Sequence, residues 1–309
     1  MKSVDALIER RLSSDVPLVR HIAEHIIGGG GKRLRPALVI LSAGCFGYSG
    51  AAHHELAAVV EFIHTATLLH DDIVDESDLR RGAQTANARF GNAPSVLVGD
   101  FLYSRAFQMM VSVGNMRVMA ILADATNSIA EGEVLQLINA RNAAVSEEDY
   151  LAVVRRKTAK LFEAAAGIGA IIAGASLEDE RLLSHYGLHV GTAFQLIDDV
   201  LDYCGDSEET GKSLGDDLSE GKPTLPLLRV IQNGTREQAA LVCHAIETGG
   251  REDFEPVMQA IRETDAIQYT REKAQSEASL ACVGIERLKE SPYRNSLLEL
   301  AKFAVNRNH

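Results

Sequence analysis

The sequence contains no tryptophan, and aromatic residues make up only 5% of its 309 residues. Alanine and leucine are abundant instead, a composition that favours packed helices over sheets. Positive charge is also scarce, since 31 Lys and Arg face 43 Asp and Glu and leave a net charge of −12. This excess of negative charge argues against nucleic-acid binding, because no basic stripe offsets it. With 46% hydrophobic and 24% charged residues, the chain has the profile of a globular protein.

The sequence also lacks closely spaced cysteines and long apolar runs. The longest apolar run without charge, residues 164–177, is too short and too rich in glycine to cross a bilayer. The segment MKSVDALIERRL has no apolar core of the signal-peptide type. We therefore expect a cytoplasmic protein with at most peripheral membrane contact, and we interpret its cysteines as reduced thiols. No CxxC spacing occurs among Cys45, Cys204, Cys243 and Cys282.

Helical periodicity covers most of the chain. We expect a long first helix, a second after the glycines at 28–31, a turn at 92–95, and a helix capped by Ser146. Four or five amphipathic helices should follow residue 226. The helix after the glycines should span about 36–46, and further helices about 52–76, 96–113 and 116–140.

A cluster of three carboxylates interrupts the apolar pattern in LLHDDIVDESDLRRG, residues 68–82. Asp71 and Asp75 are four residues apart, so on a helix they lie on one face, one turn apart, with Asp72 beside them. Neighbouring carboxylates repel one another, and a divalent cation would remove that cost. Hard oxygen ligands of this kind suit Mg²⁺ together with substrate phosphates. A solvated acidic helix end is the alternative for one isolated copy.

A second copy of the DDxxD pattern occurs in FQLIDDVLDYCGD, at Asp198, Asp199 and Asp202. An apolar helix again leads into it, and Gln195 lies on the face of Asp198 and Asp202. Two helices that end this way could face each other across a cavity and hold several metal ions, which would clamp a highly charged phosphate group. The alternative is a coincidental pair of solvated helix ends.

Two basic segments could supply further phosphate contacts. GKRLRP follows four glycines and places Lys32 and Arg35 at a helix N-terminus, where phosphates bind readily. RRKTAK presents Lys157 and Thr158 on a helix. Read alone, the first could be a glycine-rich turn and the second a solvated basic face.

A long polar segment, DSEETGKSLGDDLSEGKPTLP, follows the second DDxxD pattern. Loops of this length are uncommon unless they have a function. We therefore expect it to close over a bound phosphate group through Lys212 and Lys222.

The pair DDIVDESDLRRG and FQLIDDVLD resembles the two aspartate-rich motifs of the trans-type isoprenyl diphosphate synthases. HTATLLHDD, IAEGEVLQL and GDDLSEGKPTLPLL also resemble that family's sequence blocks. The similarity covers nearly the whole chain, is densest over residues 28–228, and is greatest to the long-chain bacterial polyprenyl diphosphate synthases, above all those that make octaprenyl diphosphate. It implies an all-α fold in which one domain, residues 1–309, forms a single large helical bundle around a deep central cavity. It also implies a homodimer.

The resemblance further implies a prenyltransferase that condenses isopentenyl diphosphate sequentially onto an allylic diphosphate, such as farnesyl diphosphate. About three Mg²⁺ ions per site would be held by Asp71, Asp75 and Asp198, with Asp72, Asp199 and Asp202 in support. Thr158 and Gln195 would shield the allylic cation. The expected contacts of isopentenyl diphosphate are Lys32, Arg35, His64 and Arg81. The expected contacts of the allylic diphosphate are Arg80, Lys157, Lys212 and Lys222.

Chain length is inferred from the helix that carries the first motif. Thr67 and Ala66 lie about 6 to 8 Å before Asp71 along that helix, and both are small. A bulky aromatic near this point blocks the product tunnel in short-chain relatives, so this chain resembles a long-chain enzyme. We name Met110 and Leu122 as candidate floor residues. The expected product has about eight isoprene units, within a range of about seven to nine, and is destined for a quinone side chain.

Two alternative functions fit part of this pattern. A class I terpene cyclase also ionises an allylic diphosphate, but it usually lacks a complete second DDxxD and does not need the GKRLRP segment. A non-catalytic subunit of a heteromeric synthase tends to lose one acidic motif, and this chain keeps both. Consumption of isopentenyl diphosphate by the purified protein alone would distinguish a catalytic from a non-catalytic chain.

Overall fold

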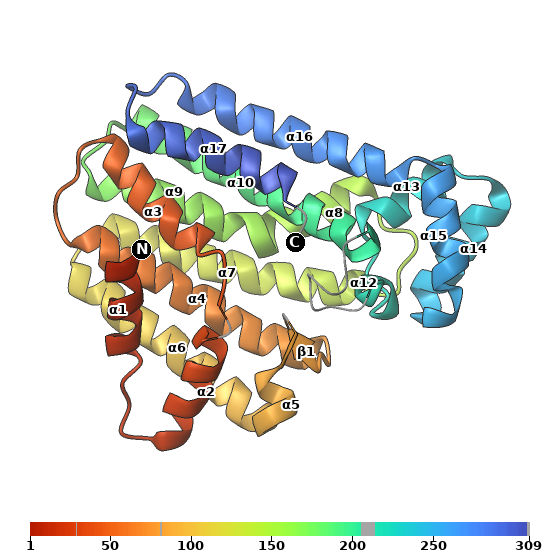
Figure 1. Ribbon diagram of the computed structural model, residues 1–309, viewed down its shortest axis with the longest axis horizontal. Coiled ribbons are helices and arrows are strands. Elements are labelled where there is room, and N and C mark those ends of the chain that lie inside the picture. The colour runs from red at the N-terminus through yellow and green to blue at the C-terminus, as the bar shows by residue number, and fades with distance from the viewer. Residues whose placement is uncertain (29, 81, 205–213, 308–309) are drawn as a thin grey trace. The chain divides into compact units, whose positions relative to one another are not determined.

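The computed structural model of the protein describes residues 1–28, 30–80, 82–204 and 214–307 (Figure 1). Regular structure within these residues is helical apart from one two-stranded hairpin, which confirms the all-α prediction. No helix in these ranges combines the length and apolar character needed to cross a bilayer.

The chain divides into two compact units. Unit 1 comprises Met1–Thr126, Leu161–Gly187 and Ile285–Leu297, and unit 2 comprises Asn127–Lys160, Leu188–Gly284 and Leu298–His309. The prediction of one domain over residues 1–309 is not tested by this division.

Unit 1 is built around α4 (Ala52–Val74), which packs most extensively against α6 (Asn92–Val113) and α3 (Leu34–Cys45) (Figure 1). The middle of α4 is buried on nearly every side, from Leu56 to Ile63. A Cβ atom at Gly99 of α6 would clash with the imidazole ring of His70, so glycine leaves room for this side chain near the first motif. The remaining elements that begin in unit 1 are α1 (Lys2–Arg11), α2 (Pro17–Gly28), β1 (Leu79–Arg80), β2 (Ala83–Gln84), α5 (Ala86–Phe90), α7 (Met116–Asn139), α10 (Leu177–Cys204) and α17 (Pro292–Asn306).

Two predicted boundaries in unit 1 are wrong. The expected single first helix is two helices, because the chain breaks after Arg11 and α2 restarts with Pro17 at its first position. Proline has no N–H to donate within a helix but suits a helix start. The expected turn at residues 92–95 is instead the first turn of α6, in which Pro94 replaces an N–H that would have no partner within the helix.

Unit 2 contains two clusters of buried side chains. One joins α13 (Leu225–Asn233), α14 (Arg236–Thr248) and α15 (Phe254–Glu263), which are neighbours in Figure 1. It includes Leu227, Val242 and Ile261. The other packs Tyr150 and Val154 against Leu196 and Ile197. Most elements after residue 226 confirm the predicted amphipathic helices. The elements that begin in or adjoin unit 2 are α8 (Glu147–Val154), the π-helix η1 (Arg155–Ala159), α9 (Lys160–Ile172), α12 (Asp216–Ser219), α13 (Leu225–Asn233), α14 (Arg236–Thr248), the 3₁₀ turn η2 (Arg251–Asp253), α15 (Phe254–Glu263) and α16 (Ala266–Ile285).

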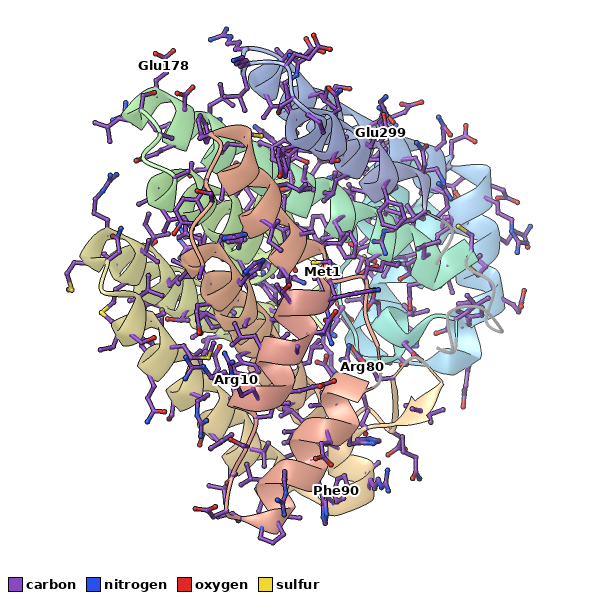
Figure 2. All side chains as sticks on the ribbon, turned by 60° about the vertical axis from the view of Figure 1, so that its left-hand side comes forward. Met1, Arg10, Arg80, Phe90, Glu178 and Glu299 are labelled. Carbon is purple, nitrogen blue, oxygen red and sulfur yellow. The ribbon has the colours of Figure 1, made fainter. Side chains whose placement is uncertain are left out.

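Charged side chains project from both units. Figure 2 shows Glu178 in unit 1 and Glu299 in unit 2 pointing away from their helices. Ser146 caps α8 as predicted, and Asp149 completes a reciprocal capping box.

Candidate active site

The first DDxxD motif lies at the C-terminal end of α4. The N–H of Asp75 donates to the carbonyl of Asp71 at 2.8 Å, so the two residues are one helical turn apart, as the spacing predicted. Glu76 then adopts a left-handed conformation, with φ of 51°, and ends the helix. Asp71 and Asp75 are half-buried, whereas Asp72 is buried.

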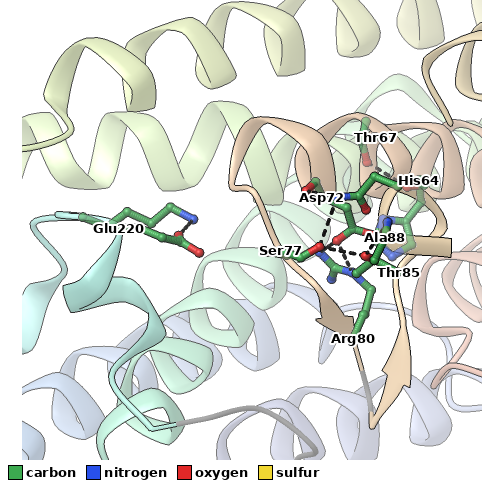
Figure 3. Close-up of polar contacts among 10 residues, drawn as sticks. His64, Thr67, Asp72, Ser77, Arg80, Thr85, Ala88 and Glu220 are labelled. Carbon is green, nitrogen blue, oxygen red and sulfur yellow. Dashed lines mark hydrogen bonds and ion pairs between the residues drawn. The ribbon is translucent and has the colours of Figure 1, made fainter. Parts of the chain in front are cut away.

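Asp72 is held from one side by Arg80. The Nε and Nη2 atoms of Arg80 approach Asp72 Oδ1 at 2.7 and 2.6 Å (Figure 3). The other carboxylate oxygen, Oδ2, is buried without a hydrogen-bond partner. Burial raises the pKa of Asp72, and the Arg80 guanidinium opposes this shift. A cation beside Oδ2 would complete the environment of this carboxylate.

The β1–β2 hairpin brings Arg80 to this position. Leu79 pairs with Gln84 and Arg80 with Ala83, and Gly82 has a φ of 74°, which glycine adopts at little cost. Thr85 donates to the carbonyl of Ser77 at 2.7 Å, and Asn87 donates to the carbonyls of Asp72 and Ser77 (Figure 3). These contacts anchor the segment that follows the motif. The predicted diphosphate contact Arg81 lies outside the described residues.

The GKRLRP segment is fixed by the arginine between its two predicted ligands. Arg33 caps α3 in a left-handed conformation, with φ of 50°, and pairs with the buried carboxylate of Glu61 on α4. Arg35 stacks over the ring of Phe162 at 4.4 Å, while Lys32 is exposed. Glu61 lies three residues before His64, so this ion pair connects the basic segment to the helix that bears the predicted histidine.

The second DDxxD motif lies on α10, and its middle carboxylate is the most buried. Asp199 is 2% exposed, and it accepts hydrogen bonds from the hydroxyl of Tyr150 and, at 2.9 Å, from Gln195 Nε2. Gln195 Oε1 in turn accepts from the hydroxyl of Thr158 at 2.9 Å. The structure thus brings together three residues that the sequence predicted, and adds Tyr150.

Burial dominates the ionisation of this group. It raises the pKa of Asp199 to about 8, with help from the negative charge of Asp217 and against the hydrogen bonds of Tyr150 and Gln195. Burial and the neighbouring Asp199 also raise the pKa of Tyr150, whose hydroxyl therefore keeps its proton at neutral pH.

This shift predicts a pH dependence of stability. Because the pKa of Asp199 is about 8 when folded and about 4 when unfolded, its proton stabilises the fold at low pH. That contribution is lost as the pH rises from about 4 to about 8. Asp199→Asn removes this contribution. In EDTA, the difference in unfolding free energy between the variant and wild type should therefore shift in favour of the variant as the pH increases, by at most about 1.4 kcal/mol per pH unit. Urea titrations from pH 5 to 8 measure this difference, and parallel pH profiles would contradict it.

The two outer carboxylates of the second motif have different partners. Asp198 is 47% exposed, and its Oδ1 lies 2.6 Å from Nη2 of Arg307, whose side chain is 3% exposed. Arg307 also donates to the carbonyl of Phe194 and stacks on its ring at 3.7 Å. Asp202 accepts a hydrogen bond from the N–H of Asp217 at 3.3 Å, which ties the start of α12 to the motif.

Lys157 and Thr158 lie on a π-helical turn, η1, within an otherwise α-helical stretch. π-Turns are rare and occur frequently at functional sites. Lys157 Nζ lies 2.6 Å from Glu133 of α7. A Cβ atom at Gly132 would lie 2.7 Å from the backbone nitrogen of Lys157, so glycine allows the π-turn to approach α7.

Gly132→Ala should therefore displace the π-turn. Because catalytic groups lose activity when moved by about 1 Å, we expect kcat to fall by about ten- to a hundredfold. Gly28→Ala is the matched control, since a Cβ atom there meets nothing within 4 Å, and its kcat should equal that of wild type. Steady-state assays of both variants measure the effect. Equal activities for Gly132→Ala and wild type would show that the π-turn position is unimportant.

The structure describes most of the remaining predicted site residues. Lys222 pairs with Glu220, and Lys212 lies outside the described residues. Ala66, Met110 and Leu122 are at most 1% exposed. Thr67 is half-buried and donates to the carbonyl of His64 at 2.7 Å. Their role as a tunnel lining stays a prediction.

The first motif belongs to unit 1 and the second to unit 2, so their expected apposition stays a prediction. Within the described ranges, no group of three or more His, Cys, Asp or Glu side chains is arranged to hold a metal ion.

Comparison with known proteins decides the family. The family model described as polyprenyl synthetase matches residues 16–264. The chain belongs to the polyprenyl synthetase family. It is therefore a prenyltransferase, as the sequence predicted.

Individual members of the polyprenyl synthetase family are similar over almost their full lengths. The octaprenyl diphosphate synthase of Escherichia coli K12 is 53% identical over 309 residues, covering 100% of this chain and 96% of that protein. The all-trans-nonaprenyl-diphosphate synthase (geranyl-diphosphate specific) of Rhodobacter capsulatus is 44% identical, with 99% and 94% covered. Among solved structures, a polyprenyl synthase from Caulobacter crescentus, complexed with calcium and isoprenyl diphosphate, has a TM-score of 0.97 at 44% identity, with 100% and 95% covered.

The contacts that sequence reasoning missed are long-range or depend on backbone geometry. Tyr150 precedes Thr158 by eight residues, and the π-turn that starts between them removes the regular α-helical spacing that would have connected them. Arg307 is more than a hundred residues from Asp198, and no local pattern connects them. The π-turn has no sequence signature beyond the small residue that faces it, Gly132.

Proposed function

We propose that this prenyltransferase adds isopentenyl diphosphate repeatedly to an allylic diphosphate, giving a trans-polyprenyl diphosphate of about eight isoprene units. The observation that carries the proposal is the presence of two complete DDxxD motifs, the second hydrogen-bonded to Gln195 and through it to Thr158. The product length rests on the greater identity to the octaprenyl than to the nonaprenyl synthase, 53% against 44%. Farnesyl diphosphate is the proposed primer, and a quinone side chain the proposed destination.

The residues of both motifs fit Mg²⁺. Carboxylate oxygens are its preferred protein ligands, Asp72 keeps one buried oxygen without a hydrogen-bond partner, and Asp198 is exposed enough to reach a ligand. Asp71, Asp75 and Asp198 would hold about three ions per site. When bound, Mg²⁺ would neutralise the charge of the diphosphate leaving group.

The protein side chains then position the two substrates. Lys157 and Lys222 would bind the allylic diphosphate together with Arg80, and Lys212 is proposed for the same role. Lys32 and Arg35 would hold the diphosphate of isopentenyl diphosphate, with His64 and Arg81 beside them. The Arg33–Glu61 ion pair supports this arrangement because it fixes the backbone between Lys32 and Arg35.

The reaction begins when the C1–O bond of the allylic substrate breaks and its electron pair leaves with the diphosphate. Oxygen atoms of Thr158 and Gln195 stabilise the resulting cation, in a site from which water is excluded. The double bond of isopentenyl diphosphate attacks C1, and a new C–C bond forms. A proton is then lost to the released diphosphate, so no histidine or glutamate is required as base.

A homodimer of a cytoplasmic enzyme is the proposed assembly. Apolar side chains are exposed along α6, including Leu97, Phe107 and Val111, and along the end of α7, including Leu137 and Ile138. Exposed apolar stripes of this kind are typical of protein interfaces. Contact with a membrane would be peripheral at most.

Incorporation of labelled isopentenyl diphosphate by the purified protein with Mg²⁺ tests the catalytic proposal. A cyclase would instead consume an allylic diphosphate alone and release a hydrocarbon or alcohol. A non-catalytic subunit would incorporate no label although folded. The intact second motif favours the synthase over both.

A further inference from the structure

The hydrogen bonds around Asp199 form a directed chain that runs from the core of unit 2 to Thr158. Its members are Tyr150, Asp199, Gln195 and Thr158. Tyr150 and Asp199 are buried, whereas Gln195 and Thr158 are half-buried. The chain therefore starts on fixed groups and ends on groups that a substrate can approach.

The direction of these bonds follows from the carboxylate. When ionised, the carboxylate of Asp199 can only accept hydrogen bonds, so the phenol of Tyr150 donates to Oδ2 and Gln195 Nε2 donates to Oδ1. An amide that donates at one end presents its carbonyl oxygen at the other. Gln195 Oε1 consequently faces Thr158 and accepts a hydrogen bond from its hydroxyl at 2.9 Å.

The orientation of Thr158 has a chemical consequence. A hydroxyl has one proton and two lone pairs. With its proton committed to Gln195, Thr158 can present only lone pairs to a ligand, and the carbonyl oxygen of Gln195 is likewise negative. If the amide of Gln195 were reversed, its N–H would donate to Thr158 and free the hydroxyl proton to point outward. The chain thus selects the arrangement that attracts a cation.

We propose that Tyr150 is a positioning residue for the prenyl-transfer reaction, which keeps Asp199 and Gln195 oriented so that Thr158 turns its lone pairs toward the allylic cation. The inference rests on the proposed function, because it assigns the charge to an allylic substrate. Tyr150 itself touches neither substrate nor metal in this account. Its role is to fix which oxygen of Asp199 serves Gln195.

Tyr150→Phe tests the inference, since it removes only the hydroxyl. Tyr186→Phe is the matched control, because Tyr186 is also buried and donates its hydroxyl proton, at 2.6 Å to the carbonyl of Leu297 in unit 1. Both variants should lose similar thermal stability. Only Tyr150→Phe should lower kcat and kcat/KM together, by about tenfold, with the KM for isopentenyl diphosphate unchanged.

Binding provides a readout that does not depend on turnover. We would measure, by calorimetry with Mg²⁺, the affinities of an unreactive allylic thiolodiphosphate and of an allylic ammonium analogue bound together with inorganic diphosphate. Tyr150→Phe should weaken only the ammonium analogue, by about tenfold, whereas Tyr186→Phe should leave both affinities unchanged.

If Tyr150→Phe weakens the binding of both analogues to the same extent, Tyr150 has a merely structural role. If it weakens neither, the hydroxyl does not orient the hydrogen-bond chain. Both results would overturn the inference. If Tyr150→Phe does not fold, Asp199→Asn serves as second variant, because it keeps the shape but can reverse the Gln195 amide. The same selective loss is expected there, and equal affinities would overturn the inference. Failure of the wild-type protein to incorporate isopentenyl diphosphate would contradict the proposed function separately.

Discussion

Asp71→Asn is expected to lower kcat at saturating substrates by about a thousandfold. The substitution keeps the size and shape of the side chain but removes the charge that would hold Mg²⁺. The leaving diphosphate then develops its charge without compensation, and a thousandfold corresponds to about 4 kcal/mol of lost transition-state stabilisation. Single-turnover label incorporation measures the chemical step directly, and Mn²⁺ binding followed by electron paramagnetic resonance measures metal affinity without turnover.

Glu76→Gln is the matched control for this experiment. Glu76 is an exposed acid at the same end of α4, so its removal changes the local charge by the same amount without removing a proposed ligand. Its kcat should stay within about threefold of wild type. Equal losses in the two variants would mean that the charge of the helix end, rather than coordination by Asp71, supports catalysis.

Ala66→Tyr is expected to shorten the product to about four or five isoprene units while turnover continues. Ala66 is fully buried on α4, about 8 Å before Asp71 along the helix axis. A phenol ring at this depth would fill the space that the growing chain needs after one or two additions. Thin-layer or mass-spectrometric analysis of the dephosphorylated products gives the length distribution.

Ala66→Ser controls for the loss of alanine without adding bulk, and its product length should match wild type. Overpacking of a buried site costs about 1–3 kcal/mol, so the unfolding temperature of Ala66→Tyr should be measured alongside. A folded, active Ala66→Tyr variant that still makes the full-length product would remove Ala66 from the tunnel wall.

Most of the fold could be predicted from sequence because α-helical periodicity is a local property. The bounds of α4 and α7 differ by two residues or fewer from the ranges that periodicity and turn residues predicted. The break before Pro17 was missed because apolar spacing continues across it, although proline marks a helix start. The β1–β2 hairpin is only two residue pairs long, too short to produce a strand pattern.

The candidate site was predictable where chemistry repeats in sequence and less so where it depends on distant contacts. Both DDxxD motifs and the basic segments are visible because their charged residues are adjacent. Arg80 illustrates the limit: sequence suggested a diphosphate ligand, and the structure shows its contact with Asp72. The pairing of Arg307 with Asp198 follows from tertiary packing alone.

The product formed by the purified protein tests the account most directly. The reaction would contain Mg²⁺, farnesyl diphosphate and labelled isopentenyl diphosphate, and the product length would be determined after dephosphorylation. A dominant product of about eight isoprene units is expected, because both acidic motifs are complete and the small side chain of Ala66 is proposed to leave room for the growing chain. A product of about four units would contradict the open tunnel, and a folded protein that incorporates no label would contradict catalysis itself.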